Sequence, residues 1–477
     1  MKDNKLFAVL THFDKVEQNR LRKYIRSPYF NVNETLMDFY DILTNHIRKN
    51  ADNGDPLSKE GIWRQLFGKE AYNDVRFRKL CSDLLKQIER YLAQEVYDES
   101  PLQQANYLFE AVSRKKIEKL YNSSERNARL ISEQQNLKPA TFYYYQYLIE
   151  KNYYELLEID MKRSDKSNVE NIINFLDEFY LAEKLKWYNS LLSRTNLVSH
   201  EYKILFIDEI IEHIKKHSYE HNPVILIYYQ ILLTKIDSSE EVHFRKLIEL
   251  LKIHGSRFPM IELYSLYSDV LNYCTQKGNQ GKKEFLHDFH EIYKFMLKNE
   301  IAFYASSSGE LSPWNFKNAI QVSLRLGQYE WAEKFITNFQ DRLPEDFKQN
   351  AVSYNLAMVY FYQKKFDKAT TLLHSVEYED IAYNLGSKSM LLAMYYEQDE
   401  FEPLLSLLDT FKTYLNRHKD INEKMRLNYQ NYILFVRKLT KIMPGDKKAV
   451  TSLRQEIKDA KGVASEKWLL EKLEELS

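Results

Sequence analysis

The chain has 477 residues, more than a single hydrophobic core normally serves, which predicts either two or three domains or one extended array of repeats. It contains only 11 glycines and 10 prolines. Tight turns and phosphate-binding loops use glycine, so this scarcity argues against sheet-rich folds and nucleotide-binding α/β folds and favours an all-α chain. The 68 basic and 68 acidic residues leave no net charge that would draw the protein to nucleic acid or anionic lipid.

The N-terminal residues do not have the pattern of a signal peptide. Residues 1–18 are charged throughout and lack an apolar core, and no run of about 18 apolar residues follows anywhere. Cys81 and Cys274 lie far apart inside helical patterns, so neither a disulfide framework nor a clustered thiolate metal site is available. We therefore expect a cytoplasmic protein with reduced thiols and no membrane partner.

Two helices are predicted at the start of the chain. Apolar residues recur at helical spacing from Lys5 to Ile25, and this helix should end before Pro28, because the residue preceding a proline is disfavoured in the helical region. Asn31 and Glu34 have the spacing of a capping box that opens a second helix reaching about Arg48. The polar residues 50–56 are expected to form a loop.

The next pair of helices carries a resemblance. A helix follows Ser58 and ends at Gly68, and Asn73 opens a longer one that continues to about Ser100. This arrangement resembles the winged-helix domain of response-regulator effectors, although the glycine-containing β-hairpin of that family is missing. The resemblance implies nucleic-acid contacts from the start of the second helix, namely Arg76, Arg78 and Lys79.

Residues 101–258 are expected to form irregular helical repeats. The pattern predicts helices at Leu102 to Tyr121, from about Arg126 to Leu137, and from Pro139 to Met161. A pair of helices is predicted from Asn168 to Thr195, another helix from His200 to Lys216, and one opened by Asn222 and Pro223. Paired antiparallel helices joined by short polar links favour an α-solenoid.

The repeat phase becomes readable between Pro313 and about Asp409. Leu356, Ala357, Tyr360, Phe366 and Ala369 stand at the signature positions of the tetratricopeptide repeat, which this segment closely resembles. Consecutive anchors Tyr329, Phe366 and Phe401 are 37 and 35 residues apart, near the family period of about 34. The resemblance predicts a TPR-like α-α superhelix over residues 259–477, ending in capping helices at Phe411 to Arg437 and Lys447 to Leu476.

In this family the first helices of successive repeats line a concave groove that takes extended peptides or helices. The resemblance places the following residues on that surface: Trp314, Lys317, Gln321, Arg325, Tyr354, Met358, Tyr362, Ala393 and Tyr396. A mixture of aromatic and polar side chains suits a protein-binding surface. The alternative interpretation is that some of these aromatic residues pack against a following helix.

The sequence contains few patterns of a catalytic or metal-binding site, and their settings argue against such a site. His213, His217 and His221 have helical spacing, but they lie at a predicted helix end, where histidines complement the helix dipole. Glu240 with His243 and Glu284 with His287 have di-iron spacing without the two further inward glutamates that such a site needs. Nucleophile elbows, phosphate-binding loops and Cys-x-x-Cys motifs are missing. No enzyme, no cofactor and no metal are expected.

These observations predict a helical N-terminal module at 1–100 ahead of the repeats, with a helix-turn-helix-like arrangement as one interpretation of it. The expected function is a non-enzymatic scaffold or adaptor whose groove binds a peptide or helix of a protein partner. The alternative is a nucleic-acid-binding regulator with the TPR-like array as its sensor. In overall style, with excess Tyr, Asn and Lys, the chain also resembles cytoplasmic proteins of Bacteroidota whose activity is not known.

Overall fold

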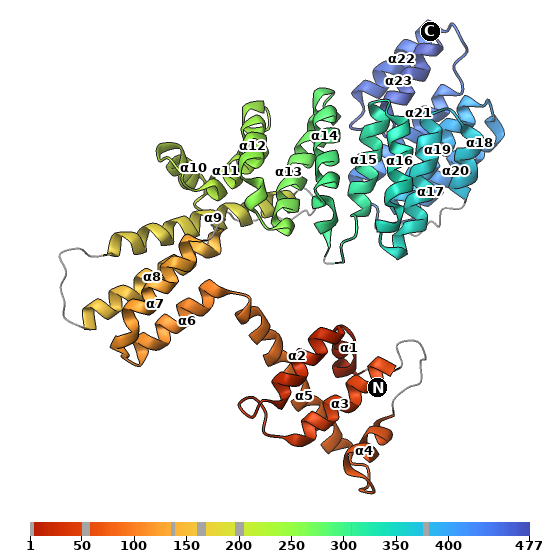
Figure 1. Cartoon of the computed structure of the whole chain (residues 1–477). Coiled ribbons are helices and arrows are strands. Elements are labelled where there is room, and N and C mark those ends of the chain that lie inside the picture. Colours follow the sequence, from red (N-terminus) through yellow and green to blue (C-terminus); the bar gives the residue numbers. More distant parts are fainter. Residues whose placement is uncertain are drawn as a thin grey trace. The chain divides into compact units, whose positions relative to one another are not determined.

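Every regular element in the described part of the chain is a helix (Figure 1). The computed structural model describes residues 4–49, 58–134, 139–159, 168–195, 205–306, 308–374 and 381–477. Within these ranges lie 23 α-helices and three short 3-10 helices, without a β-strand. The all-α prediction is therefore confirmed. No helix in these ranges combines the length and the apolar composition that a membrane crossing requires.

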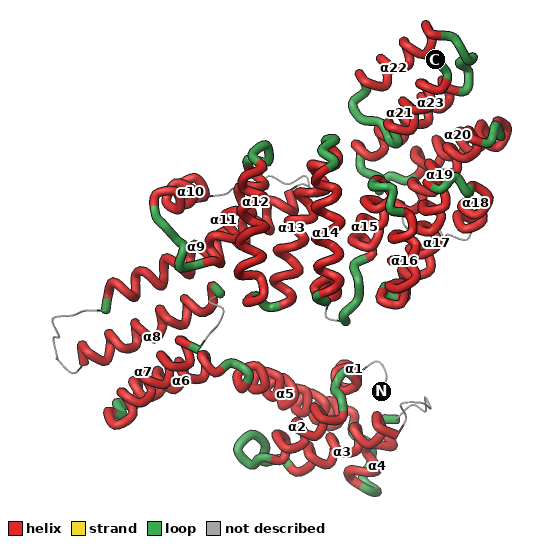
Figure 2. Tube along the Cα trace, turned by 45° about the horizontal axis from the view of Figure 1, so that its top comes forward, coloured by secondary structure: helices red, strands yellow, loops and turns green. Residues whose placement is uncertain are grey.

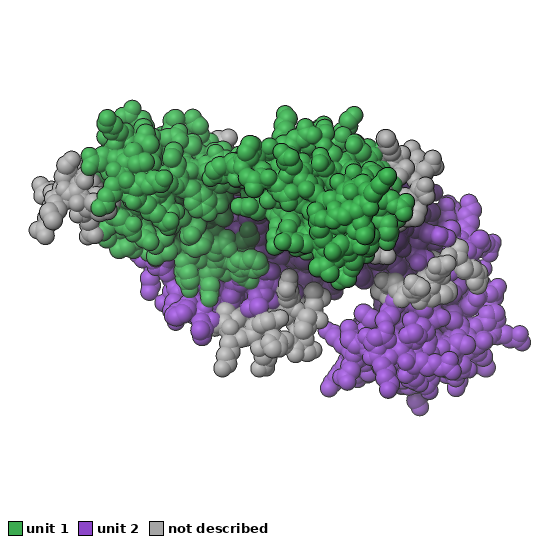
Figure 3. All heavy atoms as spheres, turned by 90° about the horizontal axis from the view of Figure 1, so that it is seen from below, with its two compact units in different colours: residues 1–187 green, residues 188–477 purple. Residues whose placement is uncertain are grey.

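The chain divides into two compact units, residues 1–187 and 188–477 (Figure 3). The boundaries expected at residues 100 and 258 fall at helix ends, because Ser100 caps α6 and Phe258 closes the short 3-10 helix before α13. The division into three parts stays a prediction. Residues 50–56, expected to form a loop, lie outside the described residues.

Five helices enclose the first hydrophobic core of unit 1. Its centre contains the fully buried side chains of Phe39, Trp63, Phe77 and Leu84. The helices are α1 (Lys5–Thr11), α2 (Lys15–Arg26), α3 (Glu34–Lys49), α4 (Lys59–Phe67) and α5 (Asp74–Asp98). The predicted caps at Ser58, Gly68 and Asn73 are confirmed.

The single helix predicted from Lys5 to Ile25 was wrong, because the chain breaks at Asp14. The Asp14 side chain accepts hydrogen bonds from the backbone of Val16 and Glu17, and the Glu17 carboxylate accepts from the Asp14 backbone at 2.8 Å. This capping box starts a new helix and satisfies backbone donors that would otherwise lack partners. Asn31 was also misplaced as a cap, since it is buried and donates to the Ile25 carbonyl oxygen.

Four further helices form a second core in unit 1. They are α6 (Pro101–Arg114), α7 (Glu118–Glu133), α8 (Ala140–Ile159) and α9 (Val169–Thr195). The helix predicted at Leu102 to Tyr121 is interrupted at Lys116, whose φ of 55° lies in the left-handed region. The helix pair predicted between Asn168 and Thr195 was also wrong. No glycine or proline interrupts that stretch, and it forms one helix of 27 residues.

Unit 2 is a succession of antiparallel helices, most of which pack against the next helix in the chain (Figure 2). The earlier ones are α10 (Ile207–Lys216), α11 (Pro223–Ile236), α12 (Glu241–His254), α13 (Met260–Asn279) and α14 (Glu284–Lys298). The later ones are α15 (Pro313–Arg325), α16 (Tyr329–Phe339), α17 (Glu345–Tyr362), α18 (Phe366–His374), α19 (Ile381–Glu397), α20 (Phe401–Arg417), α21 (Glu423–Leu439), α22 (Lys447–Asp459) and α23 (Glu466–Glu475). Each predicted closing segment thus contains a break between two helices.

The phase predicted from Tyr329, Phe366 and Phe401 agrees with the helix boundaries. Each of these anchors is the first residue of a helix, namely α16, α18 and α20. Two residues before each anchor the backbone turns through a positive φ, at Gly327, Lys364 and Asp399. Ala357 and Ala369 are fully buried, where small side chains let α17 and α18 approach closely. The three segments therefore share one local geometry.

Candidate functional site

A groove lies along the first helices of these segments in unit 2. It encloses about 720 Å³ and is lined by side chains from α15, α17, α19 and α21 and from the region of α23. The helix contacts explain its position, because α17 contacts both α15 and α19, so their faces form a continuous surface. We call this feature the C-terminal groove. Its volume is in the range that accommodates a small ligand or a few side chains of a peptide.

Aromatic side chains form much of the wall of the C-terminal groove. Tyr354 and Tyr362 come from α17, Tyr429 from α21 and Trp468 from α23. Burial is the main cause that raises the pKa of Tyr354, of Tyr362 and of Tyr429. These phenols therefore stay neutral at physiological pH and can donate hydrogen bonds as well as offer apolar ring faces.

The structure brings together five of the residues predicted for this surface. Gln321, Tyr354, Met358, Tyr362 and Ala393 all line the C-terminal groove. Their accessibility differs, because Tyr354 is 4 % and Met358 5 % exposed whereas Tyr362 is 43 % exposed. Tyr362 is thus the most accessible aromatic side chain of this predicted set within the groove.

The other four predicted residues lie outside the lining. Trp314 is exposed at the start of α15, and the ammonium group of Lys317 lies 5.2 Å from the ring centre of Tyr354. Arg325 donates hydrogen bonds to the backbone oxygen of Gly278 and the side chain of Asn279, which ties α15 to the end of α13. Tyr396 packs edge-on against Trp468, with ring centres 5.5 Å apart. This last contact matches the alternative in which an aromatic residue packs against a following helix.

Helix α23 supplies a wall that the sequence pattern did not predict. The indole nitrogen of Trp468 donates to the Glu397 carboxylate at 3.1 Å, and Lys472 pairs with the same carboxylate at 2.7 Å. Burial opposes the charge on Lys472, but hydrogen bonds to Glu397 and Glu475 outweigh it and leave its pKa raised. These bonds anchor α23 to the end of α19. The only sequence signal was a tryptophan and a lysine on one face of an amphipathic helix.

Polar and charged groups complete the lining. Ser389 is 8 % exposed, and its hydroxyl oxygen has no hydrogen-bond partner within the described structure. The side-chain oxygen of Asn428 also has no hydrogen-bond partner there. Buried polar atoms without partners are uncommon, so both oxygens are suited to meet a ligand. Lys364, Lys424 and Lys467 outnumber the acidic Glu397 and Glu471 in the lining. Because Lys472 neutralises Glu397, the groove is positively charged overall.

The basic residues predicted to contact nucleic acid lie at the start of α5. The Arg76 guanidinium group pairs with Glu70 at 2.8 Å and lies 4.1 Å from the ring centre of Phe67. Arg78 pairs with Asp74 one turn earlier, and Lys79 is exposed. Only Glu99 and Ser100 separate α5 from α6, so no β-hairpin follows α5.

The histidine tract lies at the end of α10. His213 forms a hydrogen bond of 2.7 Å with the Tyr219 hydroxyl group, and the ring centres of His213 and His217 are 4.5 Å apart. The ring of His221 stacks with that of Tyr219, with ring centres 5.8 Å apart. Glu240 and Glu284 stand at the N-terminal ends of α12 and α14 and are exposed. Among the described residues, no group of three or more histidine, cysteine and acidic side chains could hold a metal ion.

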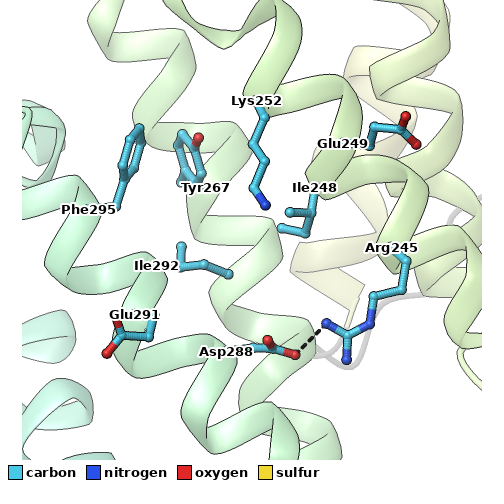
Figure 4. A pocket seen from close by; sticks show the side chains of 9 residues that line it. All are labelled: Arg245, Ile248, Glu249, Lys252, Tyr267, Asp288, Glu291, Ile292 and Phe295. Atoms are coloured by element: carbon cyan, nitrogen blue, oxygen red, sulfur yellow. Dashed lines mark hydrogen bonds and ion pairs between the residues drawn. The ribbon is translucent and has the colours of Figure 1, made fainter.

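A second hollow, of about 470 Å³, opens over α12, α13 and α14 (Figure 4). Arg245 from α12 reaches Asp288 from α14 and forms an ion pair of 2.7 Å, which Figure 4 draws as a dashed line. Tyr267 and Phe295 lie at the opposite end of the hollow. The ion pair joins the two helices across this surface, and we assign it a structural role.

Comparisons of this chain with protein-family models, with curated proteins and with solved structures found no match.

Proposed function

We propose that this chain is a non-enzymatic scaffold or adaptor that binds a segment of another protein in the C-terminal groove. The proposal rests on one observation above the others, the groove of about 720 Å³ walled by Tyr354, Tyr362, Tyr429 and Trp468. Tyrosine and tryptophan are the side chains that most often carry binding energy at protein interfaces. A peptide or helix that inserts one apolar side chain between these rings would bury it well.

The repeated local geometry supports a TPR-like superhelix as the framework of this groove. Helices α15, α17 and α19 are the first members of three successive pairs, and each pair turns at an equivalent residue with positive φ. In a stack of such pairs the first helices line one surface over its whole length. The lining drawn from α15, α17 and α19 fits this arrangement.

The charge of the lining favours an acidic partner segment. Lys364, Lys424 and Lys467 are all exposed at the groove, whereas Glu397 is bound by Lys472. An aspartate or glutamate beside the inserted apolar side chain would meet these ammonium groups. Such rim charges contribute mainly to the rate of association and to specificity. We propose that this interaction takes place in the cytoplasm.

The nucleic-acid alternative has no comparable support. The guanidinium groups of Arg76 and Arg78 lie against Glu70 and Asp74, so binding phosphate would require breaking these pairs. The exposed ammonium group of Lys79 is a single charge, whereas affinity for DNA normally draws on several phosphate contacts. We therefore keep peptide binding as the one proposed function.

The test is selection of a random peptide display library on the full chain, followed by fluorescence anisotropy with labelled selected peptides. We expect acidic peptides with one large apolar residue, and we expect Tyr362→Ala and Lys424→Glu each to weaken their binding by about tenfold. Tyr304→Ala removes a similarly exposed tyrosine elsewhere in unit 2 and is the control. A failure to enrich any peptide, or binding that ignores both groove variants, would contradict the proposal.

A further inference from the structure

Helix α9 of unit 1 presents an exposed apolar stripe that is independent of the C-terminal groove. Ile173, Leu176, Tyr180 and Trp187 are 53 %, 44 %, 44 % and 64 % exposed. Their spacing of three, four and seven residues is that of the a and d positions of a coiled coil. Isolated exposed apolar residues are common, but apolar residues that recur on one face over several helical turns mark an interaction surface. We call these four residues the α9 stripe.

The core of unit 1 takes up a different face of the same helix. Phe175 and Phe179 pack into the second core of the unit, and the ring of Phe179 lies 5.3 Å from that of Tyr144. Residues 176 and 180 follow these two core positions by about a quarter of a turn, so the stripe runs beside the core face and points away from it. The stripe is therefore not needed to hold α9 in place.

Two of the charges that flank the α9 stripe, Glu170 and Lys184, complement those of a second antiparallel copy, whereas Asp177 would lie beside its own copy near the two-fold axis. In the heptad set by Ile173 and Tyr180, the flanking e positions are Glu170, Asp177 and Lys184. The N-terminal half of this flank is thus acidic and its C-terminal half is basic. Glu170 and Lys184 are about 21 Å apart on one helix, too far to pair with each other. An antiparallel copy of α9 would bring each of them to its opposite charge.

We propose that the α9 stripe is the contact of an antiparallel homodimer, with a second copy of this chain as its partner. With the two-fold axis near residue 178, Tyr180 packs beside the partner's Leu176, and Glu170 faces the partner's Lys184. The apolar pairs centre on residue 178 and the ion pairs on residue 177, so one antiparallel register accommodates both. A homodimer contact of this kind is isologous, with the same surface used on both copies.

The position of Glu183 selects the antiparallel orientation. Glu183 occupies a d position within the stripe, and its carboxylate accepts a hydrogen bond from the Trp187 indole at 2.7 Å. In a parallel pair the two Glu183 side chains would face each other, and like charges at a contact are unfavourable. In the antiparallel pair Glu183 lies beside the partner's Ile173, with its charge still bound by Trp187.

The experiment is sedimentation equilibrium of the full chain across about two decades of micromolar concentration. We expect a monomer–dimer equilibrium that Leu176→Glu abolishes. Val96→Glu places the same charge on an exposed apolar site of α5 and should leave the dimer intact. A wild-type chain that stays monomeric throughout, or a dimer that tolerates Leu176→Glu, overturns the proposal.

Charge reversal tests the register without touching the apolar residues. Glu170→Lys and Lys184→Glu should each raise the dimer dissociation constant by about tenfold, because each replaces two attractive contacts with two repulsive ones. The double variant exchanges the charges and should return the constant to within about threefold of the wild type. Because Glu170 is exposed and Lys184 is not buried, we expect folding to be preserved. If the single variants weaken the dimer and the double variant does not restore it, the antiparallel pairing is overturned.

Discussion

A side-chain carbon on Gly386 would overlap the phenol ring of Tyr354. A Cβ atom built on Gly386 lies 2.9 Å from Cζ and 3.0 Å from Cε2 of Tyr354, and closer still to the hydroxyl oxygen. Real Cβ atoms do not approach ring carbons this closely, so α19 needs glycine at this point in order to pack on α17. Because both residues line the C-terminal groove, the same contact fixes the shape of the proposed binding site.

We therefore expect Gly386→Ala to lower the free energy of opening around α17 and α19 by about 1–3 kcal/mol. Hydrogen–deuterium exchange of peptides covering residues 345–397 measures this change. Gly255→Ala is the matched control, since Gly255 has a helical φ of −57° and the added carbon would lie 3.5 Å from Leu263. That variant should be neutral or slightly stabilising. Equal protection in Gly386→Ala and the wild type would contradict the packing described.

A buried histidine predicts how stability depends on pH. His290 is 3 % exposed, and burial, with a smaller contribution from Lys294, lowers the pKa of His290. Its Nδ1 atom lies 3.2 Å from the Ser323 hydroxyl oxygen. The unfolded chain takes up a proton near the usual histidine pKa of about 6.5, whereas the folded chain resists protonation. Between these two pKa values the unfolded state binds more protons, so stability is full above about pH 6.5 and falls as the pH drops below it.

We expect His290 to make the free energy of unfolding fall by at most about 1.4 kcal/mol for each unit by which the pH is lowered. Urea unfolding of unit 2 in the full chain between pH 8 and pH 5 measures this dependence. His290→Gln should weaken the dependence of the free energy of unfolding on pH, whatever its effect on the absolute stability. His287→Gln changes an exposed histidine of the same helix and should keep this dependence. A wild-type stability that rises on acidification would show that the sign is wrong.

Helical periodicity predicted most elements but not where long runs break or continue. Asp14 and Glu17 form a capping box inside an amphipathic run, and the apolar spacing on both sides hid this break. In α9 the opposite error arose. Its apolar residues point both to the core and to the α9 stripe, so no single face stands out, and the pattern suggested two helices. Both cases show local spacing competing with packing that involves residues far away in the sequence.

The candidate site was predictable to the extent that it follows the repeat. Gln321, Tyr354 and Tyr362 could be placed because the repeat phase assigns each residue a side of its helix. Trp468 could not be placed, because the contact with Tyr396 joins residues that are 72 positions apart. The periodicity of α23 shows that it has an apolar face, but only the folded chain shows that this face meets α19.

The structure and the nucleic-acid alternative imply different roles for Arg76. Its guanidinium group lies over the rings of Phe67 and Trp63 and pairs with Glu70, so it connects the end of α4 to the start of α5. Arg76→Ala should lower the local opening free energy there by about 1 kcal/mol, and Arg76→Lys should recover only part, because an ammonium group cannot stack as a planar guanidinium does.

Hydrogen–deuterium exchange of residues 59–98 in the full chain measures the effect of these Arg76 variants, with the exposed Lys79→Ala as a control expected within about 0.5 kcal/mol of the wild type. Unchanged exchange in Arg76→Ala, together with a loss of salt-dependent DNA binding, would instead assign this guanidinium group to phosphate contacts. Reduced protection without any effect on DNA would establish that the charge at the start of α5 serves the packing of α4.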